Sequence, residues 1–204
     1  VRSDRARAPG TQMKVNARFV ISAAKPADFP PGRLPEVAVV GRSNVGKSSL
    51  INALVHQQGL ARTSRTPGRT RLLNWFEVDE RFHLVDLPGY GYAAVDKDTR
   101  VGWQPLIEAY LDKRDVLAGV LLLVDVRRGP EDEELDFVPW LQQREVPIVV
   151  ALTKADKLPK NKRMLEVAKA KKTLALKRDP FAVSAQTGDG IDELWRAVDK
   201  LVRK

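Results

Sequence analysis

The 204-residue sequence contains no cysteine and only two histidines. Without cysteine the chain forms no disulfide and offers no thiolate, which excludes disulfide-rich secreted scaffolds and cysteine-based metal sites. Long apolar runs are also missing, since the longest, Val116–Val124, has the length of a strand and not of a membrane span. The basic N-terminus has no apolar segment behind it and so does not resemble a signal peptide. We expect a cytoplasmic protein with no membrane segment.

The remaining composition is that of a basic globular domain. Apolar residues make up 43% of the sequence and charged residues 30%, as in ordinary soluble proteins. Lysine and arginine number 35 against 26 acidic residues, for a net charge of +9. This excess favours a polyanionic partner such as RNA, the alternative being a basic protein without one. Residues 1–13 are expected to be a disordered basic tail, and residues 14–204 a single domain.

Strand-like and helix-like segments alternate along the chain and predict an α/β fold. The expected strands are Val37–Val40, Leu72–Val78, Arg81–Val85, Ala118–Asp125, Val146–Leu152 and Phe181–Ser184, with Val15–Ala23 as an edge strand or extended arm. The expected helices are Lys47–His56, Gly102–Lys113, Glu131–Arg144, Asn161–Lys177 and Ile191–Val202. We therefore predict a mostly parallel sheet of six or more strands with helices on both faces.

The stretch Gly41–Ser48 reads G-x-x-x-x-G-K-S between a strand and a helix. This is the context of a phosphate-binding loop, whose backbone N–H groups point into one concavity at a helix N-terminus. Lys47 supplies a positive charge for the β- and γ-phosphates, and Ser48 supplies a hydroxyl for Mg²⁺. The alternative is a chance loop. We assign nucleotide contacts to Gly41, Arg42, Ser43, Asn44, Val45, Gly46, Lys47 and Ser48.

A second motif, D-x-x-G, follows the apolar stretch His83–Val85 and consists of Asp86, Leu87, Pro88 and Gly89. Alone it is typical of an ordinary turn. Behind a phosphate loop it becomes a candidate sensor of the metal and the γ-phosphate. The carboxylate of Asp86 would hold Mg²⁺ through water, and the N–H of Gly89 would contact the γ-phosphate.

A third motif, T-K-x-D, follows the strand Val146–Leu152 and consists of Thr153, Lys154, Ala155 and Asp156. The Asp156 carboxylate can accept hydrogen bonds from N1–H and the 2-amino group of guanine, which adenine does not offer in that arrangement. The Lys154 stem would lie along the purine. Ser184 and Ala185 come at the end of a later strand, and their backbone N–H groups could bind the guanine O6, a weak signal that matters only by its position. The family resemblance described below extends this contact to Val183. The alternative for Thr153–Asp156 is an exposed charged loop.

The loop around Thr66–Thr70 is the fourth candidate. A threonine hydroxyl from a mobile segment can complete Mg²⁺ coordination when a γ-phosphate is present. We favour Thr70 over Thr66 and over Thr63, and keep an ordinary Pro-Gly turn as the alternative. The family resemblance described below implies nucleotide contacts from Gly68, Arg69, Thr70, Arg71 and Leu72 of this segment.

The order of these motifs resembles the translation-factor-related GTPases and, in detail, the bacterial EngB family. The resemblance extends from Arg18 to Leu201, and its most specific part is Gly89-Tyr90-Gly91-Tyr92 after the D-x-P. Further pieces that carry it are Ala17–Val20, Ser22–Ala24, Leu34–Val37 and Asn74–Phe76. Arg71 departs from the pattern, which has glutamine or another polar residue there.

The resemblance implies a Ras-like P-loop domain that binds GTP and GDP with Mg²⁺ and hydrolyses GTP slowly. Ser48 and Thr70 would be the metal ligands, and Lys47, Thr70 and Gly89 the catalytic groups. It also implies a role in assembling the large ribosomal subunit, through the subunit or its rRNA, and in normal cell division and septation. We expect a monomer.

One catalytic part is missing, because Tyr90 stands where signalling GTPases place the glutamine that orients water. Turnover of the isolated protein should therefore be slow. An arginine from a partner, or Arg65, Arg69 or Arg71 of this chain, is one substitute; an RNA or protein surface that orders both loops is another. Asn44 suggests K⁺ as a third, with a simple turn residue as the alternative.

The segment between Asp156 and Asp179 is strongly basic and suggests RNA contact, although a solvated helix face is the usual fate of such a run. Its basic residues are Lys157, Lys160, Lys162, Arg163, Lys169, Lys171, Lys172, Lys177 and Arg178. Two other functions stay open. One is a P-loop ATPase or nucleotide kinase, and the other is an RNA-binding module that binds guanine nucleotide with negligible turnover.

Overall fold

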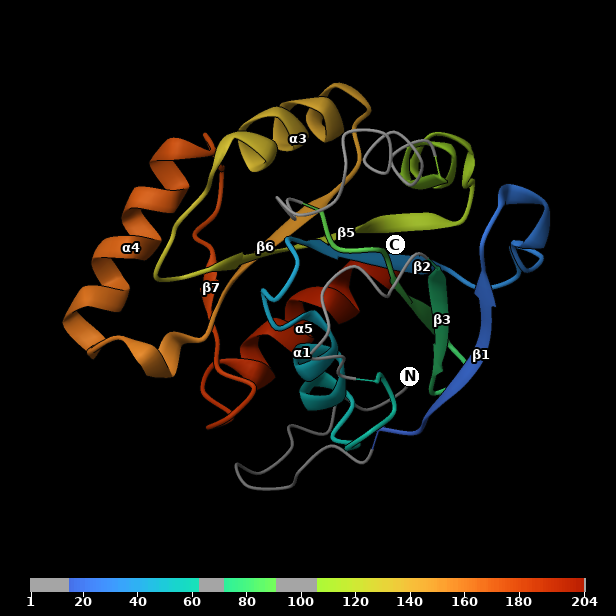
Figure 1. The fold of residues 1–204 in the computed structure, drawn as a ribbon, viewed down its shortest axis with the longest axis horizontal. Coiled ribbons are helices and arrows are strands. Elements are labelled where there is room, and N and C mark those ends of the chain that lie inside the picture. Colours follow the sequence, from blue (N-terminus) through green and yellow to red (C-terminus); the bar gives the residue numbers. More distant parts are fainter. Residues whose placement is uncertain (1–14, 63–71, 91–105, 204) are drawn as a thin grey trace, which may run out of the picture.

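The computed structural model describes residues 15–62, 72–90 and 106–203. They form a seven-stranded sheet in the order β1-β3-β4-β2-β5-β6-β7 (Figure 1). The strands are β1 (Ala17–Ala23), β2 (Glu36–Gly41), β3 (Leu73–Val78), β4 (Phe82–Asp86), β5 (Leu117–Asp125), β6 (Ile148–Thr153) and β7 (Phe181–Ala182). The helices are α1 (Lys47–Leu54), residues 106–113, α3 (Asp132–Gln143), α4 (Lys160–Thr173) and α5 (Ile191–Val202), with short 3₁₀ turns η1 (Pro26–Asp28) and η2 (Ala155–Lys157).

The sheet is mostly parallel, as predicted. Strand β2 lies in the centre and pairs in parallel with β4 on one side and β5 on the other. The parallel order continues through β6 to β7, whereas β3 runs antiparallel to both β1 and β4. The carboxyl ends of the parallel strands therefore meet at one edge, where ligands bind in open α/β sheets.

Alternating side chains of β2 point into two cores, one on each face of the sheet. Val37 and Val39 belong to the core that contains Leu50 of α1 and Leu194 of α5. Ala38 and Val40 belong to the opposite core, with residues 106–111 and α3. Figure 1 shows α1 and α5 on one side of the sheet and α3 on the other. The period of two in β2 thus fixes a three-layer arrangement with helices on both faces.

The boundaries of several elements differ from those expected. Helix α4 ends at Thr173 and not at Lys177, because Leu174 turns into the core and Ala175 takes a left-handed φ of 49°. Strand β7 is only Phe181–Ala182. Leu106 and Ile107 are buried as expected, whereas Trp103 and residues 1–14 lie outside the described residues. Within the described ranges, no helix is both long enough and apolar enough to cross a membrane.

Candidate nucleotide-binding site

The predicted phosphate loop connects the end of β2 to the start of α1, as the motif requires. Gly46 caps the helix with φ +100°, a left-handed conformation that favours glycine. Glycine at position 41 is required by packing, because a Cβ there would lie 2.8 Å from the carbonyl oxygen of Leu123 on β5. The loop is therefore held by close packing against β5 as well as by its turn.

The D-x-x-G motif lies directly beside this loop. Asp86 ends β4, is buried, and forms an ion pair with the Lys47 ammonium. Gly89 packs against Ser43 so closely that a Cβ would come within 3.1 Å of the Ser43 nitrogen and Cα. The Ser43 N–H donates to the Tyr90 carbonyl at 2.8 Å. The structure thus brings together the two motifs proposed to contact the phosphates.

The residues proposed for Mg²⁺ have the right donor chemistry. Ser48 is the second residue of α1 and offers a hydroxyl, and Asp86 offers a carboxylate on the neighbouring strand. Hard oxygen donors of this kind suit Mg²⁺, which binds through one or two protein groups and keeps several waters. Lys47 and Asp86 neutralise one another in the structure, so both charges are already held at the end of the sheet.

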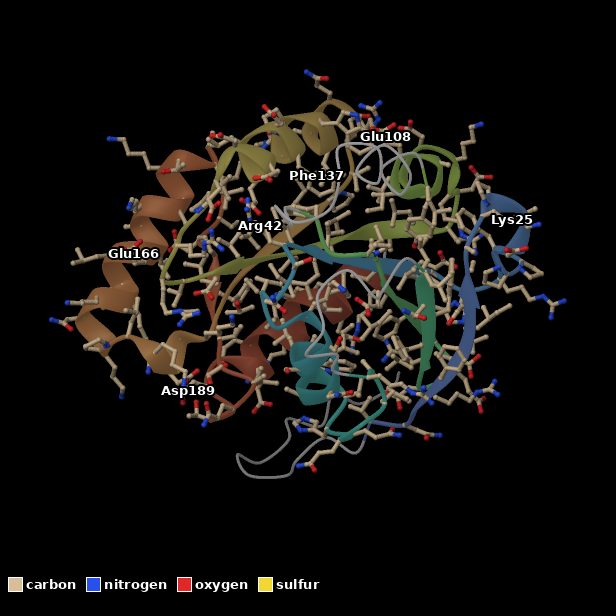
Figure 2. All side chains as sticks on the ribbon, in the orientation of Figure 1. Lys25, Arg42, Glu108, Phe137, Glu166 and Asp189 are labelled. Carbon is tan, nitrogen blue, oxygen red and sulfur yellow. The ribbon has the colours of Figure 1, made fainter. Side chains whose placement is uncertain are left out.

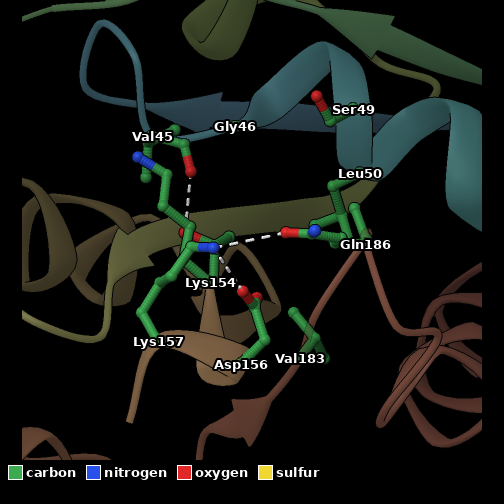
Figure 3. Close-up of a pocket in the computed structure, with 11 residues that line it drawn as sticks. Val45, Gly46, Ser49, Leu50, Lys154, Asp156, Lys157, Val183 and Gln186 are labelled. Atoms are coloured by element: carbon green, nitrogen blue, oxygen red, sulfur yellow. Dashed lines mark hydrogen bonds and ion pairs between the residues drawn. The ribbon is translucent and has the colours of Figure 1, made fainter.

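A cavity of about 360 Å³ opens between the phosphate loop and the Thr153–Asp156 motif (Figure 3). Asp156 lines it and accepts a hydrogen bond from the Ser184 hydroxyl at 2.7 Å, while Lys157 lies 2.9 Å from its other oxygen. The Ser184 hydrogen bond, and then Lys157, lower the pKa of Asp156, so the carboxylate stays ionised at neutral pH. The lining residues are Val45, Gly46, Ser49, Leu50, Thr153, Lys154, Asp156, Lys157, Val183, Ala185 and Gln186.

Two hydrogen bonds tie this motif to the phosphate loop. The Thr153 hydroxyl donates to the Val45 carbonyl at 2.7 Å, and the Lys154 ammonium donates to the Asn44 carbonyl at 2.7 Å. Asn44 and Lys154 both have left-handed backbone angles, with φ of 64° and 59°. Asparagine at position 44 is therefore explained by the turn, whatever else it does. The Lys154 side chain therefore reaches the phosphate loop at the Asn44 carbonyl, and its expected position along a purine stays a prediction.

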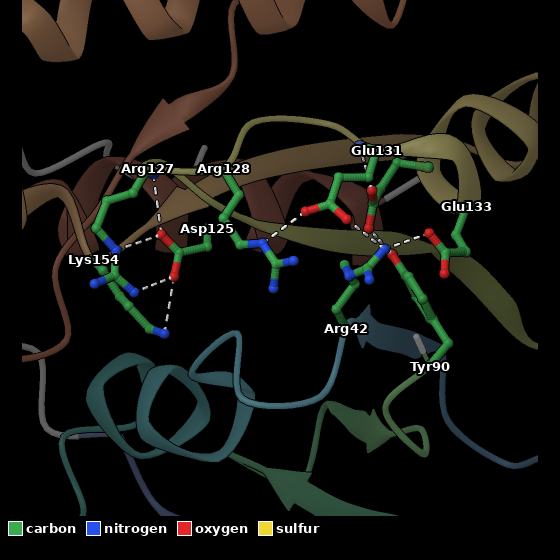
Figure 4. A network of polar contacts seen from close by, with 9 residues as sticks. Arg42, Tyr90, Asp125, Arg127, Arg128, Glu131, Glu133 and Lys154 are labelled. Carbon is green, nitrogen blue, oxygen red and sulfur yellow. Dashed lines mark hydrogen bonds and ion pairs between the residues drawn. The ribbon is translucent and has the colours of Figure 1, made fainter. Parts of the chain in front are cut away.

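Sequence reasoning missed Asp125, which ends β5 and holds Lys154 in place at 3.0 Å (Figure 4). Burial alone would raise the pKa of Asp125, but hydrogen bonds from Arg127 and Lys154 lower it well below its usual value. Arg127 binds both carboxylate oxygens, at 3.0 and 2.7 Å. The signal was present, since a carboxylate ended the longest apolar run of the sequence. Ser49, Lys157 and Gln186 were also missed as lining residues.

The remaining predicted residues are placed as follows. Leu87 is buried, and Pro88 lies between it and Gly89. Val183 and Ser184 are buried and Ala185 is exposed at the mouth of the cavity. Leu72 is described and lies just before β3. Gly68, Arg69, Thr70 and Arg71 lie outside the described residues, as do Thr63, Arg65 and Thr66.

Comparison with protein families gives two matches. A family model described as "50S ribosome-binding GTPase" matches residues 36–154, more than half of the chain. A model described as "Elongation factor Tu GTP binding domain" matches residues 106–204. The first match spans the phosphate loop, Asp86–Gly89 and the start of the T-K-x-D motif.

Two relatives of the same name agree with the match to a GTPase family. "Probable GTP-binding protein EngB" of Desulforamulus reducens is 49% identical over 193 residues, covering 93% of this chain and 94% of the relative. The protein of the same name from a Geobacter species is 47% identical over 188 residues, covering 92% and 88%.

Among solved structures, "Crystal structure of a probable GTP-binding protein engB" superposes with a TM-score of 0.70 at 24% identity, covering 82% of this chain and 98% of that one. A structure of Era with MgGDPNP and a 16S rRNA fragment gives 0.66 at 23% identity, covering 83% and 57%, and shares the fold alone. From its motifs, its fold and these relatives, the chain belongs to the EngB family of GTP-binding proteins.

Proposed function

We propose that this GTPase reads guanine through Asp156, hydrolyses GTP slowly with Mg²⁺, and acts as a nucleotide-controlled switch in the assembly of the large ribosomal subunit in the cytoplasm. The observation that carries the proposal is the position of an ionised Asp156 on the wall of a cavity that ends at the phosphate loop. A carboxylate there selects guanine because a base without the matching N–H groups would leave it unsatisfied.

The phosphate end of the site supports hydrolysis by positioning and charge. Lys47 and the backbone N–H groups of the loop would hold the β- and γ-phosphates, and Gly89 would donate its N–H to the γ-phosphate. Ser48 would hold Mg²⁺, with Asp86 nearby and Thr70 as the proposed partner from the following loop. When bound, the metal neutralises phosphate charge. Lys47 and Ser48 begin α1 just after β2, and Asp86 and Gly89 lie at and just after the end of β4, so these four groups share the carboxyl edge of the sheet.

The contacts of Tyr90 support the proposal of slow turnover. Its hydroxyl donates to Glu134 at 2.7 Å and its side chain is buried, so it is not free to orient a water molecule. An activating partner, or an arginine among Arg65, Arg69 and Arg71, would supply the missing charge. We keep K⁺ at Asn44 as a further proposal. Equal hydrolysis rates in KCl and NaCl at matched ionic strength would contradict it.

The ribosomal partner is supported by charge on α4. Helix α4, marked in Figure 2 by Glu166, lies at one end of the molecule, opposite the end that carries Lys25. Within the described part of the chain, Lys160, Lys162 and Lys172 form no ion pair, and all three side chains are exposed. Phosphate contacts would make subunit binding fall steeply with salt. Binding that is unchanged between low and moderate salt would argue against this surface. We also propose a role in normal cell division and septation. This role would arise either from the supply of ribosomes or from a separate contact.

The test of the base assignment is titration with fluorescent guanine and xanthine nucleotides, comparing the wild type with Asp156→Asn. We expect the variant to lose at least a hundredfold in guanine affinity and to gain xanthine binding, because its amide presents the opposite hydrogen-bond pattern. Asp179→Asn is the control, since Asp179 is an exposed carboxylate that also pairs with a lysine, Lys171, at 2.9 Å. Unchanged guanine binding in Asp156→Asn would favour a P-loop ATPase, which competition by ATP would reveal.

A turnover assay with ribosomal subunits distinguishes the switch from the second candidate, a guanine-nucleotide-regulated RNA-binding module. The switch predicts faster hydrolysis when subunits are added, whereas the binding module predicts negligible turnover with and without them.

A further inference from the structure

A buried hydrogen bond joins the residue after the D-x-x-G motif to helix α3 (Figure 4). The Tyr90 hydroxyl donates to Glu134 Oε1 at 2.7 Å, and both side chains are buried. The other oxygen of Glu134 accepts the Glu131 N–H at 2.8 Å. Glu134 is therefore the N3 residue of a capping box whose N-cap residue is Glu131. One carboxylate therefore caps α3 and holds Tyr90 at the same time.

A second connection runs from the phosphate loop to the same end of α3. The Arg42 guanidinium lies 3.0 Å from Glu131 and also pairs with Glu133. Arg42 and Tyr90 are partners in an isolated parallel bridge, next to the hydrogen bond from Ser43 to the Tyr90 carbonyl. The loop, Tyr90 and the N-terminus of α3 thus form one hydrogen-bonded unit.

Gly89 is partly buried and lies between the phosphate loop and Tyr90. It packs against Ser43 on one side, and its neighbour Tyr90 is held at both the carbonyl and the hydroxyl. Burial, and then the Glu134 charge, raise the pKa of Tyr90 above its ordinary value, so the hydroxyl remains a donor throughout the physiological range. The position of the Gly89 N–H therefore depends on helix α3, through the hydrogen bond that Tyr90 donates to Glu134, as well as on the phosphate loop.

We propose that Tyr90 and Glu134 are positioning residues for Gly89, and that they make the N-terminus of α3 part of the apparatus that distinguishes GTP from GDP. The inference rests on the proposed function of Gly89 as a γ-phosphate contact. Loss of the hydrogen bond releases Gly89 and weakens the binding of a nucleotide with a γ-phosphate, while GDP does not need this contact. The tyrosine in place of the usual glutamine has a role of its own under this proposal.

The test compares Tyr90→Phe with a matched variant, Tyr110→Phe. Tyr110 is also buried, and its hydroxyl donates to a buried glutamate, Glu36, at 2.9 Å, but at the amino end of β2. Affinities are measured with a fluorescent GDP analogue and a fluorescent non-hydrolysable GTP analogue. In Tyr90→Phe we expect the affinity for the GTP analogue to fall about five- to tenfold, the size of one buried hydrogen bond, and that for GDP to change less than about twofold. Tyr110→Phe should leave the ratio of the two affinities unchanged.

Glu134→Leu gives a second reading, because it removes the acceptor of the Tyr90 hydroxyl and should shift the ratio of the two affinities in the same direction. An equal loss for both nucleotides in Tyr90→Phe, the same ratio change in Tyr110→Phe, or tighter binding of the GTP analogue would overturn the inference. If the wild type binds neither probe, the proposed function itself fails, so the two failures are distinguishable.

Discussion

The two ends of the central strand β2 use the same kinds of side chain for different purposes. At the amino end, Glu36 is completely buried and accepts hydrogen bonds from Trp75 at 3.0 Å, Tyr110 at 2.9 Å and Arg114 at 2.8 and 2.6 Å. At the carboxyl end, Asp156 lines an open cavity, and Asp86 is buried beside Lys47 of the phosphate loop. A carboxylate that is fully buried among protein donors stabilises the fold, whereas one that faces a cavity can serve a ligand.

The amino end should dominate stability, and Arg114→Met tests this with the largest expected effect. The substitution leaves the buried Glu36 carboxylate without its only described arginine partner, at a cost of about 3 kcal/mol in the free energy of unfolding. Urea unfolding measures it. Arg81→Met is the control, since the pair of Arg81 with Asp199 is more exposed and should be worth less than about 1 kcal/mol. Guanine-nucleotide affinity of the folded Arg114→Met protein should stay unchanged.

The carboxyl end should dominate binding, and Asp125→Asn sharpens the contrast. Loss of the charge that holds Lys154 should lower GDP affinity about tenfold, or about 1.4 kcal/mol, with a smaller loss of stability than in Arg114→Met. Equilibrium titration and urea unfolding on the same samples give both numbers. Asp199→Asn, which removes a carboxylate far from the cavity in sequence and paired with Arg81 and Arg203, should leave affinity as it is. If both variants bind GDP equally well, Asp125 has only a structural role.

The smallest effect is expected from His83, whose buried Nδ1 has no hydrogen-bond partner among the described residues. Burial, opposed by Glu36 and Glu77, lowers the pKa of His83 below its ordinary value of 6.5. The unfolded chain therefore binds the proton first, so stability is complete above about pH 6.5 and is lost as the pH falls through the range below it. The free energy of unfolding of His83→Gln should depend less on pH between 7 and 5. An identical pH slope in the wild type would contradict this assignment.

Much of the fold followed from the sequence because its signals are local. The alternation in β2, the glycines of the phosphate loop and the acidic first turn of α3 each act within a few residues. The motifs therefore predicted which residues would meet at the carboxyl edge, and the structure confirmed that Asp86 and Gly89 lie beside the loop. Boundaries were less predictable, as in α4, where burial of Leu174 ended the helix before the basic run did.

The contacts that the sequence did not reveal join residues far apart along the chain. Nothing local in the sequence around Asp125 indicates that it pairs with Lys154, and nothing around Tyr90 indicates that its hydroxyl donates to Glu134. The sequence by itself determined the nucleotide class, because phosphate and guanine recognition depend on short motifs whose geometry the backbone repeats. Only the tertiary structure decided which carboxylates are enclosed by protein donors and which line the cavity, because burial and the choice of partner arise when strands and helices pack together.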